Sequence, residues 1–208
     1  MPGAGSRIPR KAASPRGRRR AFEVTRALDV ALRVFWRKGY EGASLDDLTS
    51  AMGINRPSLY AAFGNKESLF RQVMDRYAKG PAAFVQEALD EPTARAAVER
   101  LLFGAAAALT GPRNPPGCLA VHGALAAGET AQGIRKELVA RRAVYQTDLR
   151  RRFERARREG DLPAAVNCAD LARFVAVVHH GMAVQAAGGA SRAELRRVAR
   201  MALRAWPG

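Results

Sequence analysis

The chain has 208 residues, which is enough for one or two domains with an adequate core. Hydrophobic residues make up 48% of it and no apolar run approaches the length of a membrane span, so we expect a soluble, cytoplasmic protein without a membrane partner. The formal net charge of +16 and the pI near 11.2 call for an anionic partner, most simply nucleic acid, and so for association with the nucleoid.

The first segment, residues 1–20, is basic and contains no acid, with Pro, Gly and Ser between its arginines and its single lysine. Such a segment cannot bury enough surface to fold alone, so we expect a disordered basic arm. An arm beside a DNA-binding domain could follow the DNA backbone or enter a minor groove. It could equally be a solvated tail without a defined contact.

The first helix is expected from about Arg20 to Lys38. Its apolar stripe consists of Val24, Leu28, Ala31, Leu32 and Phe35. Gly39 should end this helix, and Tyr40 can pack back as the hydrophobic partner of that cap.

A second, short helix should start after Ser44, because Asp47 three residues later can complete a capping box. Gly53 stands where a helix usually ends in a left-handed residue. The apolar residues between them share one face, which we expect to be buried: Leu45, Leu48 and Met52.

Asn55 should cap a third helix, with Pro57 tolerated in its first turn and Leu59 and Phe63 facing inward. The residues left on the outside are Asn55, Arg56, Ser58, Tyr60 and Ala61. Two short helices joined by a tight turn are the layout of a helix-turn-helix, in which the start of the second helix enters the major groove. An ordinary helical hairpin with a solvated face is the alternative, and the basic surroundings favour DNA.

Residues 22–70 resemble the DNA-binding domain of the tetracycline-repressor (TetR) family of bacterial regulators. The residues that carry the resemblance are Ala31-Leu32-Arg33-Val34-Phe35, Gly39-Tyr40, Ser44-Leu45-Asp46-Asp47-Leu48, Ala51-Met52-Gly53-Ile54 and Leu59-Tyr60-Ala61-Ala62-Phe63-Gly64-Asn65-Lys66-Glu67-Ser68-Leu69. The resemblance implies that Ser44, Tyr60 and Lys66 bind phosphates of a double-stranded operator. It places Asn55, Arg56, Ser58 and Ala61 near base edges, together with Pro57, where relatives often carry a small or polar residue. Arg56 is the expected base reader, since its fork suits guanine.

The remainder of the chain is expected to be helical as well. Helices should cover residues 66–79, 92–109, 118–127 and 132–159, with Gly80-Pro81 bending or breaking the first of these, and two more helices should follow. We therefore expect an all-α protein of about nine helices. A helix-turn-helix domain, residues 21–65, would precede a helical effector-binding and dimerisation domain, residues 66–208.

By resemblance, the helices between residues 80 and 160 would enclose a ligand pocket. The expected lining residues are Phe84, Leu102, Phe103, Cys118, Leu119, His122 and Leu125. The alternative for each of them is plain core. Because few polar groups lie in this region, we expect a small apolar or aromatic effector.

The last two helices carry wide apolar stripes, and Ser191 with Glu194 forms a clear capping box between them. The expected interface residues are Leu171, Phe174, Val175, Val178, Met182, Leu195, Val198 and Met201. Two such helices could simply close the core. The resemblance instead implies a four-helix interface in a homodimer, which would hold two reading helices about 34 Å apart.

Cys118 and Cys168 have no CxxC or Cys/His spacing, so we expect no structural metal and two reduced, buried cysteines. Cys118 near a pocket could sense redox state, but no basic residue nearer than Arg113 would activate its thiol. No catalytic triad, carboxylate pair or glycine-rich phosphate loop stands out, so neither an enzyme nor a cofactor is indicated.

The resulting hypothesis is a homodimeric, ligand-responsive repressor that binds a palindromic operator and releases it when a small molecule enters the C-terminal domain. One alternative is an architectural DNA-coating protein that uses the basic arm without sequence preference. Another is a small-molecule carrier whose DNA surface has lost its role.

Overall fold

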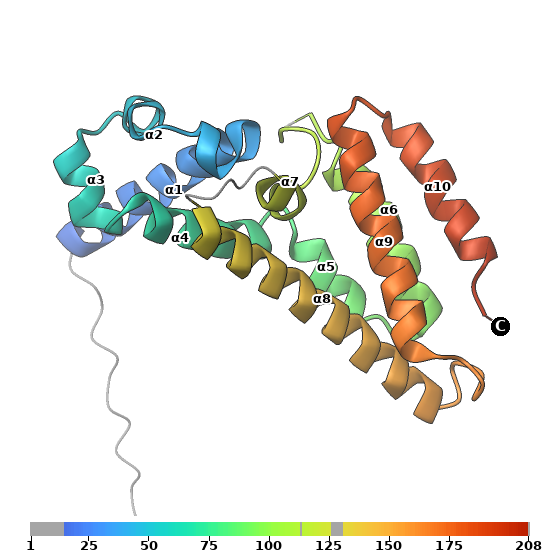
Figure 1. Cartoon of the computed structure of the whole chain (residues 1–208). Coiled ribbons are helices and arrows are strands. Elements are labelled where there is room, and N and C mark those ends of the chain that lie inside the picture. Colours follow the sequence, from blue (N-terminus) through green and yellow to red (C-terminus); the bar gives the residue numbers. More distant parts are fainter. Residues whose placement is uncertain (1–14, 113, 126–130, 208) are drawn as a thin grey trace, which may run out of the picture.

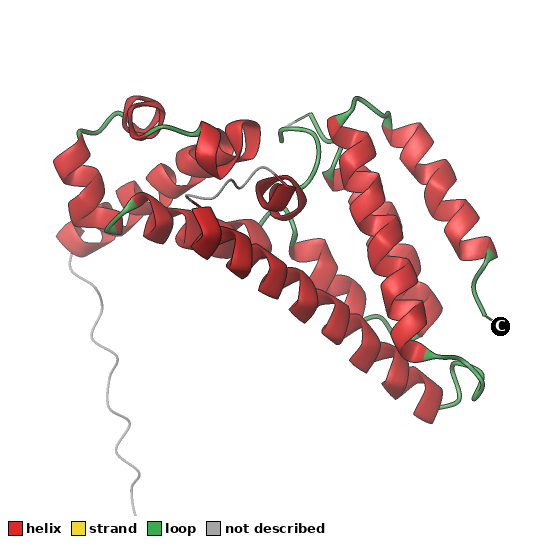
Figure 2. Ribbon diagram, viewed as in Figure 1, coloured by secondary structure: helices red, strands yellow, loops and turns green. Residues whose placement is uncertain are grey.

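The structure, a computed structural model, describes residues 15–112, 114–125 and 131–207. Within these ranges the chain forms ten helices and no strand, which confirms the all-α expectation (Figures 1 and 2). The helices are α1 (Pro15–Gly42), α2 (Leu45–Met52), α3 (Arg56–Phe63), α4 (Lys66–Lys79), α5 (Ala83–Leu89), α6 (Ala94–Ala108), α7 (Leu119–Leu125), α8 (Gln132–Arg158), α9 (Cys168–Ala187) and α10 (Arg192–Arg204). No helix of the described part has both the length and the apolar character that crossing a membrane requires.

The helix that the sequence did not predict is α5. It has only seven residues and lies just beyond Gly80, where α4 ends as expected. Its N-cap residue, Ala82, makes no side-chain hydrogen bond to the helix. Because α5 is short and uncapped, it lacks the signals by which a helix start is recognised in a sequence.

The first helix starts earlier than expected, at Pro15 instead of Arg20, so residues 15–20 of the expected arm are helical. Proline is well tolerated at a first helical position, where its missing amide has no partner in any case. The rest of the expected arm, residues 1–14, lies outside the described residues. At the other end, Gly39 interrupts the regular helix with a positive φ of 71°, as expected, but a short helical stretch continues after it to Gly42. The Tyr40 ring stacks on Phe35 with centroids 6.2 Å apart.

Apolar side chains gather into two clusters. The first cluster joins the four helices α1, α2, α3 and α4 and includes Leu48, Leu59 and Phe63. It extends past residue 65, the end we expected for the DNA-binding domain, because the whole apolar side of α4 packs into it and so do Leu119, Ile134 and Leu138.

Trp36 of α1 belongs to this first cluster and reaches the loop before α7. Its indole Nε1 donates a hydrogen bond to the carbonyl oxygen of Gly117 at 3.1 Å. The ring also meets Tyr77 of α4 edge to face, with centroids 4.9 Å apart. These contacts tie α1 and α4 to the loop before α7.

The second cluster joins α5 and α6 to α9 and α10. The far half of α8 packs into it through Leu149 and Phe153, whereas the near half, with Ile134 and Leu138, packs into the first cluster. A helix of 27 residues is about 40 Å long. As Figure 1 shows, α8 therefore runs as one rod from α4 to the start of α9.

Candidate nucleic-acid interface and candidate ligand cavity

The turn between α2 and α3 is fixed by hydrogen bonds that the sequence predicts. Ser44 Oγ accepts a hydrogen bond from the Asp47 amide at 3.0 Å, and Asp47 Oδ2 accepts one from the Ser44 amide at 3.0 Å. Gly53 then adopts φ 66° and ψ 34°, the left-handed conformation that glycine takes without steric cost. Asn55 Oδ1 accepts from the Ser58 amide at 2.9 Å and starts α3. The two helices are therefore held at a defined angle by local contacts.

Asp47 also receives a side chain from α1. Lys38 Nζ donates to Asp47 Oδ1 at 2.6 Å. This hydrogen bond is the first cause, and those from the Ser44 amide and hydroxyl the next, that lower the pKa of the Asp47 carboxyl to about 2. The carboxylate is thus kept ionised at the start of α2, where negative charge favours the helix dipole.

The outer face of α3 presents the side chains expected to meet DNA. Leu59 and Phe63 are buried, and the residues exposed beside them are Arg56, Pro57, Ser58, Tyr60 and Ala61. Ser44 and Asn55 are exposed as well, at the starts of the two helices. Lys66, at the start of α4, is half-buried.

Arg56, the expected base reader, is already engaged. Its Nη2 lies 2.8 Å from Asp46 Oδ1 and 3.0 Å from Oδ2, and its Nε donates to Oδ1 at 3.2 Å. The two side chains are 56% and 74% exposed, so the pair lies in solvent. The sequence contained both residues, but their ten-residue separation across the turn gave no local signal for the contact.

Lys66 has a partner too. Its Nζ lies 4.6 Å from the centre of the Tyr40 ring, which is cation–π geometry. Burial lowers the pKa of Lys66, while Glu41 and Asp47 act in the opposite direction. The Tyr40 ring thus holds the Lys66 ammonium group at the start of α4, in a position where it would be able to bind a phosphate.

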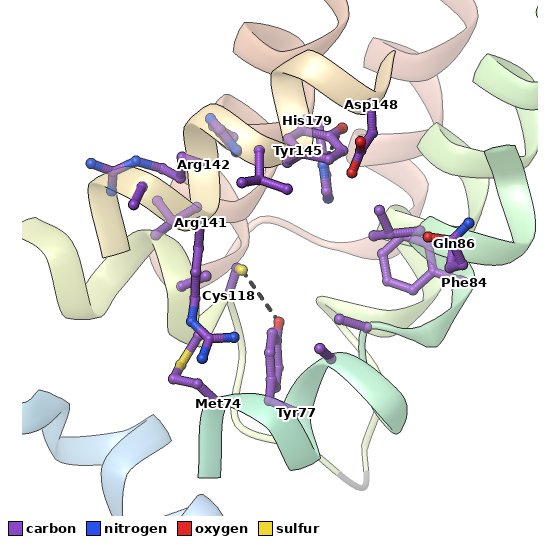
Figure 3. Close-up of a pocket in the computed structure, with 18 of the residues that line it drawn as sticks. Met74, Tyr77, Phe84, Gln86, Cys118, Arg141, Arg142, Tyr145, Asp148 and His179 are labelled. Carbon is purple, nitrogen blue, oxygen red and sulfur yellow. Dashed lines mark hydrogen bonds between the residues drawn. The ribbon is translucent and has the colours of Figure 1, made fainter. Parts of the chain in front are cut away.

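A cavity of about 560 Å³ opens between five helices (Figure 3). α4 contributes Met74 and Tyr77, α5 contributes Phe84, and the loop before α7 contributes Cys118. Most of the remaining wall comes from α7, from α8, including Tyr145, and from His179 and His180 of α9. Apolar atoms form most of the surface, and the size suits a small organic molecule.

Two polar pairs lie in this wall. Tyr77 Oη donates to Cys118 Sγ at 3.2 Å, and Tyr145 Oη lies 2.9 Å from His179 Nδ1. Burial, and then the neighbouring His180, lower the pKa of His179 to about 3. Burial raises the pKa of Tyr145 and of Tyr77 above the ordinary value, with Cys118 as the next cause in both cases. The histidine is therefore neutral and both phenols are protonated at neutral pH.

The structure places two of the expected lining residues, Phe84 and Cys118, in the cavity wall. Leu102 and Leu119 do not line it, because both are fully buried within the apolar clusters. Phe103 lies under the guanidinium of Arg196 outside this cavity, with 4.7 Å between the guanidinium carbon and the ring centre.

The two other expected lining residues lie in α7. His122 does not line the cavity either, and none of the described residues gives its buried Nε2 a hydrogen bond. The side chain of Leu125 lies outside the described residues. The apolar periodicity of the sequence predicts the buried helices, but it does not predict which turn of each helix lines the cavity.

The polar lining residues were missed by sequence reasoning. The expectation of few polar groups overlooked Tyr145 and His179, which are 34 residues apart on different helices. The histidine pair was visible in the sequence but gave no indication of a cavity. Met74 and Tyr77, on the buried side of α4, also line the cavity.

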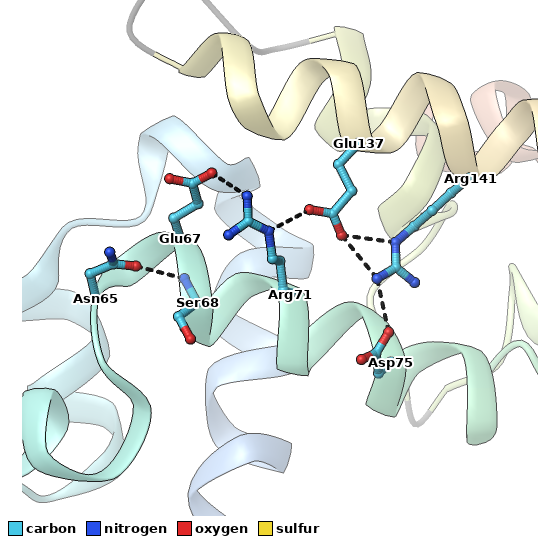
Figure 4. Close-up of polar contacts among 7 residues, drawn as sticks. All are labelled: Asn65, Glu67, Ser68, Arg71, Asp75, Glu137 and Arg141. Atoms are coloured by element: carbon cyan, nitrogen blue, oxygen red, sulfur yellow. Dashed lines mark hydrogen bonds and ion pairs between the residues drawn. The ribbon is translucent and has the colours of Figure 1, made fainter.

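Four charged residues join α4 to α8 beside the cavity, and we call them the α4–α8 ionic cluster: Arg71, Asp75, Glu137 and Arg141. Arg71 Nε donates to Glu137 Oε2 at 2.7 Å, and Arg141 Nη2 donates to Asp75 Oδ1 at 2.8 Å and to Glu137 Oε1 at 2.9 Å (Figure 4). Glu137 and Arg141 also line the cavity. The cluster therefore links the cavity wall to α4, the helix that follows α3.

The outer side of α9 and α10 is apolar and uncovered in the single chain. Its large side chains are Phe174, Val177, Val184, Val198 and Met201, of which Val177 and Met201 are 63% and 66% exposed. Of the expected interface residues, Leu171 and Val178 are half-buried and Phe174, Val198 and Met201 are exposed.

The other three, Val175, Met182 and Leu195, are not on this face but in the core, each 1% exposed. The inward side of α9 consists largely of alanines, so a search for large apolar residues could not separate its two faces.

An all-α chain with a capped two-helix turn and an exposed second helix belongs to the helix-turn-helix class of DNA-binding proteins. Residues 27–73 match the family described as "Bacterial regulatory proteins, tetR family", and residues 94–202 match "Tetracyclin repressor-like, C-terminal domain". The chain belongs to the TetR family and is a DNA-binding transcriptional regulator, not an enzyme.

Curated relatives agree with this assignment. The chain is 34% identical to the transcriptional repressor ComR of Escherichia coli (strain K12) over 194 residues, which is 92% of each chain. It is 30% identical to the repressor BdcR of the same organism over 190 residues, covering 89% of this chain and 90% of that one.

Solved structures agree as well. A cysteine-substituted CifR, a TetR-family regulator complexed with 26-bp double-strand operator DNA, has a TM-score of 0.85 and 39% identity, covering 96% of this chain and 100% of that one. A second CifR complex with operator DNA has a TM-score of 0.84 and 43% identity, covering 87% and 95%.

Proposed function

We propose that this regulator is a homodimeric repressor that binds a palindromic operator and releases it when a small molecule fills the cavity. One observation carries the proposal: α4 packs into the DNA-binding cluster and also forms a wall of the cavity, through Met74 and Tyr77. Filling the cavity therefore acts directly on the helix that follows α3.

On the DNA side, Ser44, Tyr60 and Lys66 would bind phosphates, which position the protein without reading sequence. The exposed start of α3, with Asn55, Pro57, Ser58 and Ala61, would lie in the major groove, and Arg56 would read a guanine. The relatives named as repressors and the operator complexes of CifR support this arrangement. Such a repressor works at the nucleoid, in the cytoplasm.

On the ligand side, the effector and the operator would favour different positions of α4. Each then weakens the binding of the other by the same factor. The α4–α8 ionic cluster supports this coupling, because it joins the cavity wall to α4 through hydrogen bonds of 2.7–2.9 Å.

The exposed apolar face of α9 and α10 would be the dimer interface, and a two-fold axis would set the two reading helices about 34 Å apart. Val177→Glu places a charge on this face, so it should give a monomer in sedimentation and lose operator affinity. Arg158→Glu, at the end of α8, is the control and should stay dimeric. A dimeric Val177→Glu protein would contradict the proposed interface.

The function is tested by selecting genomic fragments on the purified protein at near-physiological salt. The wild type should recover one or a few palindromic sites, and the double variant Tyr60→Ala, Lys66→Ala should lose them. Arg158→Ala, which also removes one positive charge, should keep them.

Recovery without sequence preference that survives the double substitution would contradict the operator model. It would favour instead an architectural protein whose +16 net charge drives binding. Absence of any recovery, with intact ligand binding, would favour a carrier.

A further inference from the structure

The inner wall of the cavity is aromatic and internally hydrogen-bonded. Tyr145 Oη lies 2.9 Å from His179 Nδ1, and the Phe84 ring meets His179 edge to face with centroids 6.0 Å apart. Figure 3 shows the His179 ring pointing into the hollow between Phe84 and Tyr77. No described side chain bonds its second nitrogen, Nε2, which is therefore left for a guest.

The charged residues of the wall are already paired, with one exception. Arg141 is held by Asp75 and Glu137, and Asp148 lies 3.8 Å from Arg151. Arg142 is the only charged lining residue for which the described residues provide no ion partner. Its guanidinium lies at the edge of the group, on the side away from Phe84 and Tyr77 (Figure 3).

The groups nearest the centre carry no charge at neutral pH. The pKa of His179 lies near 3, and the pKa of Tyr77 and of Tyr145 is raised by burial. Burial, and then the neighbouring Arg142, also lower the pKa of His180. An ion at the centre of the cavity would lose its hydration, and the one unpaired charge of the described wall, Arg142, lies at the edge, so entry of an ion carries a large cost.

Building on the proposed function, we infer that the cavity takes an uncharged molecule with an apolar, largely aromatic body and one polar group that hydrogen-bonds to His179 Nε2. Tyr145 positions the histidine for this bond through its own bond to Nδ1. Phe84 and Tyr77 flank the body of the guest. The wall therefore selects against both carboxylates and cationic amines.

Three probes of nearly equal shape test the charge preference: biphenyl-4-carboxamide, biphenyl-4-carboxylate and biphenyl-4-carboxamidinium. Isothermal titration of the full chain without DNA, at pH 7.5, should give the carboxamide at least tenfold higher affinity than either ion. Equal or tighter binding of one of the ions would overturn the inference. So would failure of the carboxamide to bind up to its solubility limit.

Variants test the residues. His179→Phe keeps an aromatic ring but removes the hydrogen bond, so the carboxamide should bind about tenfold more weakly. If His179→Phe does not melt cooperatively, Tyr145→Phe serves as the second variant. It should also weaken carboxamide binding. Arg158→Gln, outside the cavity, should leave carboxamide affinity unchanged. Selective loss of carboxylate binding in Arg142→Gln would show that the cavity is an anion site instead.

Operator release separates this inference from the proposed function. If the carboxylate binds and releases the operator, the repressor model stands and the uncharged-guest inference fails. If the carboxamide binds with the expected preference but the operator stays bound, the inference stands and the ligand-release model fails.

Discussion

Arg56 and Asp46 form an exposed ion pair, which would have to open if Arg56 reads a guanine as proposed. The guanidinium edge that would face a guanine is the edge that Asp46 now occupies, with Nη2 2.8 Å from Oδ1. An exposed pair of this kind contributes about 0–1 kcal/mol, so a base can replace the carboxylate at little cost. Asp46 would hold the reader in place before DNA arrives.

Removing the guanidinium should relax specificity at one base pair. Arg56→Ala should weaken binding to the preferred operator by about 1–3 kcal/mol and barely change binding to operators altered at that base pair. Equilibrium binding to a set of single-base operator variants measures this. Equal loss on every sequence would refute a reading role for Arg56.

Removing the carboxylate should act differently. Asp46→Asn takes a negative charge away from the DNA-facing surface, so affinity for all sequences should rise while the order of preference stays the same. The same operator set measures the change, and its size should shrink as salt is raised. A changed base preference in Asp46→Asn would show that Asp46 itself contributes to reading.

The Asp47 carboxyl makes the start of α2 sensitive to acid. Its folded-state pKa of about 2 lies below its ordinary value of 3.8, so folding favours the ionised form. The stability that it contributes is present above pH 4 or so and is lost as the pH falls through about 2. Melting temperatures of the wild type and Asp47→Asn should therefore differ at pH 6 and converge toward pH 2. If the difference in melting temperature between the two proteins does not shrink toward pH 2, the Asp47 carboxylate is not the source of this acid sensitivity.

Among the elements, α6 approaches α5 closely at a glycine. A Cβ added to Gly104 would lie 2.9 Å from Cδ2 of Phe84, closer than atoms can pack. Phe84 lines the cavity, so the missing side chain at Gly104 makes room for one of the cavity's aromatic walls.

Filling this space should push Phe84 toward the cavity. In Gly104→Ala, overpacking costs about 1–3 kcal/mol while better helix propensity returns about 1 kcal/mol. We expect a net loss of stability and weaker carboxamide binding. In a Phe84→Ala background the two nearest contacts, Cδ2 and Cγ, are gone, so there Gly104→Ala should be neutral or stabilising. Equal destabilisation in both backgrounds would show that the ring is not the cause.

Elements with local signals were predictable and the cavity was not. The capping boxes at Ser44 and Ser191 and the left-handed Gly53 depend on neighbours within a few residues, and each is present in the structure. The Tyr145–His179 pair depends on how α8 and α9 pack, which periodicity does not specify. The apolar pattern of the sequence also places core residues of α9 on its outer face. The core side of α9 contains many alanines, so the positions of its large apolar residues do not identify that side.

At the scale of the whole molecule, α8 belongs to both apolar clusters and its middle turns line the cavity. Its first turns also hold α4 through the α4–α8 ionic cluster. A displacement of the middle of a stiff helix is carried to both of its ends. The cluster is thus placed to relay ligand binding to the DNA-facing helices.

Cutting the cluster should uncouple the two sites. The double variant Arg71→Met, Asp75→Asn removes both contacts from α4, leaves the cavity wall intact and keeps the net charge. Operator affinity and biphenyl-4-carboxamide affinity should each stay within about threefold, while the coupling between them falls by about 0.5–2 kcal/mol.

The coupling is measured by titrating the operator with and without the carboxamide. Arg100→Met cuts ion pairs to Glu87 and Glu91 away from α4 and α8, so it should keep the coupling. A double variant with wild-type coupling would exclude the cluster as the relay.

The edge-to-face contact of Trp36 with Tyr77 has a practical consequence. The chain has two tryptophans, and the other one, Trp206, packs against Phe153 in the second cluster. Only the Trp36 indole touches a ring that lines the cavity, and its Nε1 is bonded to Gly117, one residue before the lining Cys118. A guest that moves Tyr77 therefore changes the surroundings of one indole and not the other. The protein carries its own optical probe, and a shift in Trp36 fluorescence reports occupancy of the cavity without any label.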